Sequence, residues 1–199
     1  MNPEIEFRYS GIYDARYRNS IKIQEFLKKN KEKYPSIDTI EKYISKIKPL
    51  WKEHEKKILI GLSKITGLKW KEERIICYII GYGRCFSDPL TVKLFKNKND
   101  FIDTLTHELI HQIQFQNDNK LKKWWKFVYK RYRKESRLTK NHILLHAIHS
   151  RLMLDLFGEK RLKREIKNSQ KFPDYKRSWD IVEKEGYENI IKEFKKRLR

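Results

Sequence analysis

The chain is poor in cysteine and short of acidic side chains. Cys77 and Cys85 are its only cysteines among 199 residues. Two thiols can build neither a disulfide framework nor an all-cysteine zinc site, and such sparing use of cysteine fits a reducing compartment. We therefore expect an intracellular protein whose fold does not depend on disulfide bonds.

Signals for export and for membrane insertion are missing as well. The N-terminus carries Glu4, Glu6 and Arg8 among polar residues, where a signal peptide would have a basic and then an apolar stretch. No apolar run approaches the roughly 18 residues that a membrane-spanning helix needs. The sequence predicts a soluble, cytoplasmic protein with no membrane partner.

Basic residues are in large excess and are unevenly placed. Lys and Arg number 47 against 26 Asp and Glu, a formal net charge of +21, and residues 120–140 carry ten basic side chains and one acidic one. Cations there alternate with aromatics such as Trp124 and Phe127, as on surfaces that bind nucleic acid. The aromatics also recur at helical steps, so an amphipathic helix explains them equally well. Nucleic-acid contact through residues 120–140 is one expectation, and a charged surface adapted to heat is its rival.

One segment carries a pattern specific to metal chemistry, the run His107-Glu108-Leu109-Ile110-His111. On a helix, two histidines four residues apart project from one face, and the glutamate between them stays near whatever they bind. Apolar residues recur at steps of three and four from 101 to 113, while Asn99 and Asp100 suit a helix N-terminus. The sequence predicts a metal-binding helix that ends at the polar residues 117–119.

A catalytic zinc ion needs a third protein ligand, because it normally takes three and leaves the fourth position to water. The extended motif H-E-x-x-H-x-x-G-x-x-H fails, since Gln114 and Asn117 stand at its glycine and last histidine. A downstream segment supplies His142, His146 and His149 at steps of four and three, which places them on one helical face. From the residues alone, each of the three is a candidate ligand.

The H-E-L-I-H run resembles the zincin metallopeptidases, and the resemblance covers residues 75–157. In the gluzincin branch, which includes thermolysin and the small archaeal minigluzincins, a downstream helix has an Asn-Glu-x-x-x-Asp-like pattern. Its Glu binds zinc and its Asp supports a zinc histidine. Asn141-His142-x-x-x-His146 has the same spacing with histidine in both places. The resemblance implies zinc on His107, His111 and His142, with His146 as supporting or alternative ligand.

The resemblance further implies a zinc metallopeptidase that hydrolyses a peptide or protein substrate. Glu108 would be the general base that takes a proton from the zinc-bound water. His149, Arg151 and Tyr175 are candidates for a donor to the oxyanion. A site of three neutral histidines would leave zinc with more positive charge than a site of two histidines and a glutamate. The zinc ion would therefore be a stronger Lewis acid.

Two other functions are consistent with these residues. An all-histidine site also resembles the SprT-like DNA-associated proteases, which would make the chain a nucleic-acid-associated protease. A non-catalytic zinc-containing module that binds nucleic acid is the third possibility.

The predicted fold is α+β, mostly helical, with a small β-sheet before the motif helix. Strands are expected within 75–80 and 90–95, the latter as a cleft rim that pairs with substrate, and a short strand within 1–20. Helices are expected over 21–33, from 36 or 38 to 65 with a break or start at Pro49, over 120–135, from 139 or 141 to 157, and over 179–198.

Three parts of the chain are expected from this pattern. Residues 1–74 form an N-terminal helical region, 75–157 a zincin-like catalytic core, and 158–199 a C-terminal helical segment packed on that core. The resemblance to latent minigluzincins adds the expectation that the chain from Asn168 onward folds across the cleft.

Overall fold

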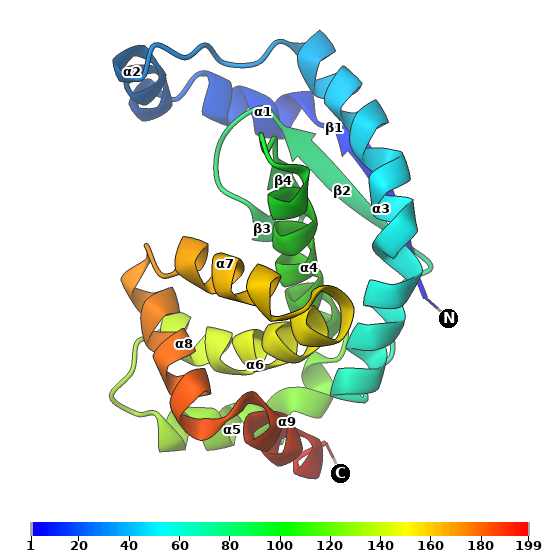
Figure 1. Ribbon diagram of the computed structural model, residues 1–199, viewed down its shortest axis with the longest axis vertical. Helices are drawn as coiled ribbons and strands as arrows, with labels where there is room; N and C mark the ends of the chain where they lie inside the picture. The colour runs from blue at the N-terminus through cyan, green and yellow to red at the C-terminus, as the bar shows by residue number, and fades with distance from the viewer. Residues whose placement is uncertain (1, 199) are drawn as a thin grey trace. The chain divides into compact units, whose positions relative to one another are not determined.

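The computed structural model describes residues 2–198 and is mostly helical with a small mixed sheet, as the α+β prediction states (Figure 1). The strands are β1 (Glu4–Tyr9), β2 (Arg74–Ile80), β3 (Phe86–Ser87) and β4 (Leu90–Lys93). The helices are α1 (Gly11–Arg18), α2 (Ile21–Lys29), α3 (Ile37–Thr66), α4 (Lys98–Phe115), α5 (Asp118–Arg131), α6 (Arg137–Phe157), α7 (Glu159–Ser169), α8 (Pro173–Glu185) and α9 (Tyr187–Lys196).

The chain forms two compact units, each made of more than one stretch of sequence. The sheet unit comprises residues 2–56 and 72–112, and the helical unit comprises residues 57–71 and those from 113 onward. The boundaries between the two units fall inside α3, in the loop between α3 and β2, and inside α4.

The sheet unit is built on strands in the order β1-β2-β4-β3. β1 pairs with β2 in parallel, from Glu4 opposite Arg74 to Tyr9 opposite Ile79, and β2 pairs with β4 in parallel. β3 adds an antiparallel edge. Figure 1 shows the first part of α3 running alongside β1 and β2. Phe7 contacts the rings of Trp51 and Phe101 there, with centroids 6.4 and 5.7 Å away, which forms the aromatic centre of this core.

A buried carboxylate joins three separate segments of the sheet unit. Asp14 has no exposed surface, and its carboxylate accepts hydrogen bonds from the Tyr34 hydroxyl at 2.7 Å, the Gly81 amide at 2.8 Å and Arg18 Nη2 at 2.8 Å. Burial, reinforced by the Asp14 charge, raises the pKa of the Tyr34 phenol. Asp14 therefore fastens α1, the segment before α3 and the end of β2 to one another.

The helical unit is centred on α6. Ser136 begins this helix, because its Oγ accepts a hydrogen bond from the Thr139 amide at 3.0 Å, and Gly158 ends it with a φ of 80°. Helices α7, α8 and α9 pack against α6, and Figure 1 shows α7 and α8 beside it. Every residue from Ile143 to Ser150 is buried, so α6 is the core helix of this unit.

The structure corrects the prediction at Pro49, which lies inside one continuous helix, α3, and neither breaks nor starts one. A proline in a helix interior costs about 3 kcal/mol. The same helix buries a stripe of large side chains, Ile40, Ile44, Ile47 and Trp51, and each contributes about 1.5–3 kcal/mol. Burial of the stripe therefore outweighs the cost of the proline.

Two other helix predictions are wrong in detail. The predicted helix over 179–198 is two helices, α8 and α9, separated at Gly186, whose φ of 81° is a conformation that favours glycine. α1 forms where no helix was predicted. Its N-cap is Ser10, whose Oγ accepts from the Tyr13 amide at 3.3 Å, and Asp14 fixes it to the sheet unit.

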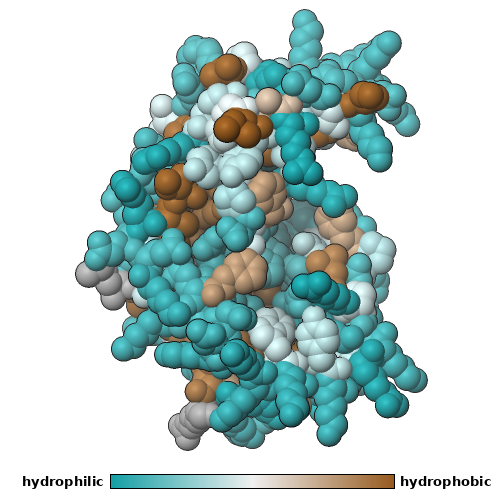
Figure 2. All heavy atoms as spheres, turned by 180° about the vertical axis from the view of Figure 1, so that it is seen from behind, coloured by the Kyte–Doolittle hydropathy of each residue, from teal (hydrophilic) through white to brown (hydrophobic). Residues whose placement is uncertain are grey.

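Hydrophilic side chains dominate the face of the protein drawn in Figure 2, and apolar side chains appear on it as separate spots. The most exposed large apolar residues among 2–198 are Ile12 and Ile21, at 84% and 75%. Within the same residues, no helix combines the length and the apolar character that crossing a bilayer requires.

Candidate metal centre

The helix that carries the H-E-x-x-H run forms as its sequence predicts. Asn97 begins it, because its side-chain oxygen accepts from the Asn99 amide at 2.9 Å, and Asp100 supplies a negative charge in the first turn. The apolar stripe of α4 is fully buried, and consists of Phe101, Ile102, Leu105, Leu109, Ile110 and Ile113. Burial of this stripe fixes the rotation of the helix about its axis, and with it the direction of the two histidines.

His107 and His111 lie one turn apart on α4, with ring centroids 5.3 Å from each other. Glu108 is 7% exposed, and burial raises its pKa to about 8. A carboxyl group with this pKa can both accept and release a proton near neutral pH. Glu108 is thus a titratable group next to the two histidines of α4.

His142 is held on α6 by a hydrogen bond that fixes its tautomer. Its Nδ1 lies 2.8 Å from the backbone oxygen of Leu138. Because a carbonyl oxygen can only accept, Nδ1 carries the proton and Nε2 keeps its lone pair. Burial also lowers the pKa of His142 to about 4, so the ring is neutral at neutral pH. A neutral imidazole, with one ring nitrogen unprotonated, is the form that binds metal ions.

His107, His111 and His142 come together as a three-histidine group. Each offers one ring nitrogen, and these three nitrogens lie within 4.8 Å of one another. Ligand nitrogens around tetrahedral zinc are about 3.3 Å apart, given Zn–N bonds of about 2.0–2.1 Å. The limit of 4.8 Å is thus wider than the spacing that a bound zinc ion would impose. No second group of three His, Cys, Asp or Glu side chains meets the same criterion among residues 2–198.

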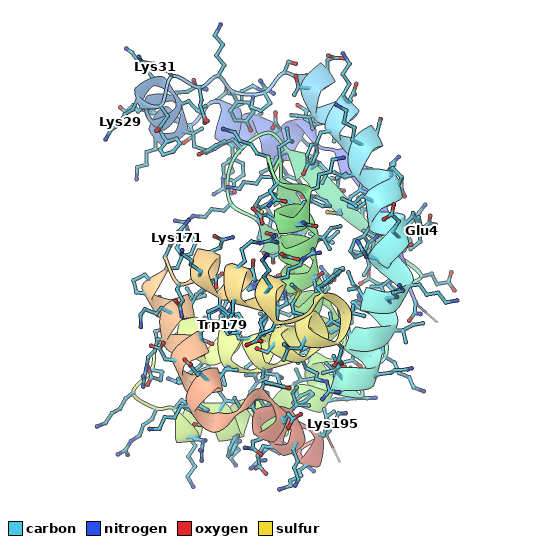
Figure 3. All side chains as sticks on the ribbon, in the orientation of Figure 1. Glu4, Lys29, Lys31, Lys171, Trp179 and Lys195 are labelled. Carbon is cyan, nitrogen blue, oxygen red and sulfur yellow. The ribbon has the colours of Figure 1, made fainter. Side chains whose placement is uncertain are left out.

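His146 and His149 lie outside the three-histidine group, and both are fully buried. The Nδ1 of His146 is 3.0 Å from Ser178 Oγ, and its ring is stacked on Trp179 at a centroid distance of 4.0 Å. His149 also faces Trp179, at 6.5 Å. Figure 3 labels Trp179 on α8, the helix that covers this side of α6. No pattern in the sequence marks these partners, which follow more than 25 residues later in the chain.

The three candidates for an oxyanion donor have different surroundings. His149 is buried beneath α8, and the guanidinium of Arg151 is engaged by Asp155 at 2.9 Å and Glu188 at 3.3 Å. The ring of Tyr175 lies against that of His142, with centroids 4.3 Å apart. Tyr175 thus contacts a member of the three-histidine group.

The predicted rim strand, residues 90–95, is covered at its first two residues. Leu90 and Thr91 are interior to the sheet, because β2 pairs with β4 on one side and β3 on the other. The short strand β3 forms the edge of the sheet beside these two residues. Gln112 of α4 donates a hydrogen bond from Nε2 to the Ser87 carbonyl, which ties the motif helix to this edge.

No protein-family model, curated protein or solved structure matches the chain. The function must therefore be inferred from the side chains of the site. Three neutral imidazoles are a donor set that suits zinc and the neighbouring divalent transition metals, and is poorly suited to magnesium or calcium, which prefer oxygen ligands.

Proposed function

We propose that the chain is a zinc-dependent metallopeptidase with a zincin-like core, in which His107, His111 and His142 hold the metal and Glu108 is the general base. The observation that carries this proposal is the three-histidine group, whose ring nitrogens lie within 4.8 Å of one another beside a buried glutamate in the H-E-x-x-H run. Three protein ligands leave a coordination position for water, which distinguishes a catalytic zinc site from a structural one.

A bound zinc ion would lower the pKa of a water molecule and polarise the scissile carbonyl group. Glu108 would accept the proton that this water loses as it attacks the carbonyl carbon. The same carboxyl group would then give the proton to the amine nitrogen as the C–N bond breaks. Burial raises the pKa of Glu108 to about 8 in the metal-free protein, and the charge of a bound zinc ion would lower this pKa again by stabilising the carboxylate that accepts the proton.

The surroundings of His142 support its role as a ligand. Metal-binding histidines usually donate their other ring N–H to a carbonyl or carboxylate, which orients the ring. The hydrogen bond from His142 Nδ1 to the Leu138 carbonyl has this form. Tyr175 lies against the face of the same ring and restricts its rotation.

The test is the substitution Glu108→Gln in protein loaded with one equivalent of zinc. Hydrolysis of denatured casein should fall by about 10²–10⁴-fold, because general base catalysis is worth about that factor. Zinc content, measured by mass spectrometry of the metal, should stay at the wild-type value. Glu53→Gln, the same change at an exposed position, is the matched control and should keep full activity.

Two results would contradict the proposal. Full activity of Glu108→Gln would remove Glu108 from the mechanism. Stoichiometric zinc with no hydrolysis by the wild-type protein would identify a structural zinc module instead.

A further inference from the structure

The helical unit contains a second feature of interest, a groove lined mainly by cations. Its walls come from the C-terminal end of α3, from α6 and from α9, and its volume is about 710 Å³. Five cationic side chains line this basic groove: Lys64, Arg151, Lys192, Lys195 and Lys196. Figure 3 labels Lys195 on α9, and its Nζ donates a hydrogen bond to the Lys64 carbonyl at 3.2 Å.

The acidic side chains of the groove do not neutralise all of these cations. Asp155 and Glu188 both pair with Arg151, and Lys196 pairs with Glu193 at 2.6 Å. Lys195 contacts a backbone carbonyl, which carries no charge. Within residues 2–198, no carboxylate pairs with the ammonium groups of Lys64 and Lys192. Three lysine charges in one concave surface therefore remain uncompensated.

We propose that the basic groove binds the phosphodiester backbone of a single-stranded nucleic acid. Lysine ammonium groups act on phosphate as point charges and do not require a fixed ligand geometry. A positively charged groove that follows the backbone is one of the two elements by which proteins bind a single strand without sequence preference, the other being aromatic side chains that stack on bases. The basic groove supplies the first of these elements. This inference goes beyond the peptidase proposal and does not depend on it.

We infer this site in the basic groove, whereas the sequence alone pointed to residues 120–140. Trp124 is 1% exposed and Val128 is fully buried, so they are core residues of α5. Trp124 contacts the ring of Phe194 at 5.5 Å and cannot stack on a base. Packing in the core therefore explains why Trp124 and Val128 occur in the basic and aromatic segment of α5. The cations of the basic groove, by contrast, line one cavity.

The experiment is a titration of a fluorescein-labelled 12-nucleotide oligothymidylate, followed by anisotropy between about 50 and 200 mM salt. Three phosphate contacts predict a slope of log K against log salt near −2, since each contact to a single strand contributes about −0.7. The double variant Lys64→Glu, Lys192→Glu should bind at least tenfold more weakly. The control Lys22→Glu, Lys29→Glu makes the same change of charge at exposed positions of α2, and should bind within threefold of the wild type.

Several results would overturn the proposal. Equal losses in the groove variant and the control would show general electrostatic attraction, and a loss confined to Lys122→Glu, Lys126→Glu would place the site on α5. Displacement of the oligonucleotide by micromolar tripolyphosphate, or by poly-glutamate at equal charge, would identify another kind of anion.

The groove variant must also be shown to fold. Circular dichroism and thermal melting provide that control, and Lys64→Gln, Lys192→Gln repeats the test without introducing negative charge. Neither lysine belongs to the three-histidine group. A negative result here therefore leaves the peptidase test unaffected, and the reverse also holds.

Discussion

The imidazole ring of His146 lies parallel to the indole ring of Trp179, with an interplanar angle of 7° and a centroid distance of 4.0 Å. Ser178, the neighbour of Trp179 on α8, approaches the Nδ1 of the same histidine. α8 thus covers His146 on the ring face and at one nitrogen. His146 therefore packs against α8, whereas His142 belongs to the three-histidine group.

Substituting each of these two histidines by asparagine should therefore have different effects on metal content. An asparagine amide can replace a hydrogen bond made through Nδ1, but it lacks a group at the position of Nε2. His142→Asn should lose zinc on dialysis, whereas His146→Asn should retain about one zinc ion per chain, as measured by mass spectrometry. The opposite pattern would make His146 the third ligand.

Removing the indole of Trp179 should destabilise the helical unit. Trp179 is 3% exposed and packs with Met153 and Leu162, and Trp179→Ala should reduce the free energy of unfolding by about 3–5 kcal/mol. Urea denaturation followed by circular dichroism measures this loss. Trp125→Ala, at a partly exposed position of α5, is the control. An equally large loss of stability in this control would contradict the assignment of Trp179 to the core of the helical unit.

Stability should fall in mild acid because of His149. Burial, with a smaller contribution from the Arg161 charge, lowers its pKa from 6.5 to about 4. Between these values the unfolded chain binds a proton that the folded protein does not, so stability is complete above pH 6.5 and is lost as the pH falls toward 4. The loss should amount to about 3 kcal/mol. His149→Gln should flatten the pH dependence of urea unfolding, and parallel curves for the two proteins would refute this.

Removing the Asp14 carboxylate should destabilise the sheet unit. Asp14→Ala leaves the Gly81 amide and the Tyr34 hydroxyl without their shared acceptor and breaks the ion pair with Arg18, so the expected loss is about 3–5 kcal/mol in urea denaturation. Asp38→Ala removes a carboxylate from an exposed pair with Lys42, and its effect should stay within about 1 kcal/mol. Equal losses of stability from the two substitutions would show that the buried contacts of Asp14 contribute little to the free energy of unfolding.

Local features of the fold could be predicted from the sequence because they depend on neighbouring residues. The stripe of α4 and the strands β2 and β4 are examples, since periodicity and β-branched residues signal them directly. α6 was also expected, although it begins at Arg137 rather than at 139 or 141, because the cap is Ser136. Helix ends depend on one side chain and are harder to locate than helices.

Features that depend on distant residues could not be predicted. The parallel pairing of β1 with β2 joins segments about 70 residues apart, and nothing in either strand specifies the other. The partners of His146 are a similar case, because Ser178 and Trp179 have no distinguishing pattern in the sequence. That α3 continues through Pro49 could not be predicted either, because it depends on which side chains the helix buries.

The group that orients His142 belongs to the main chain. Position 138 contributes its carbonyl oxygen, while the Leu138 side chain is 44% exposed and takes no part in the bond. Replacement of that leucine by any residue compatible with a helix, lysine or glutamine included, should leave the imidazole pointing in the same direction. The orienting contact of this histidine is thus protected from most point mutations at position 138, and a saturation library at that codon should retain metal binding throughout, proline excepted.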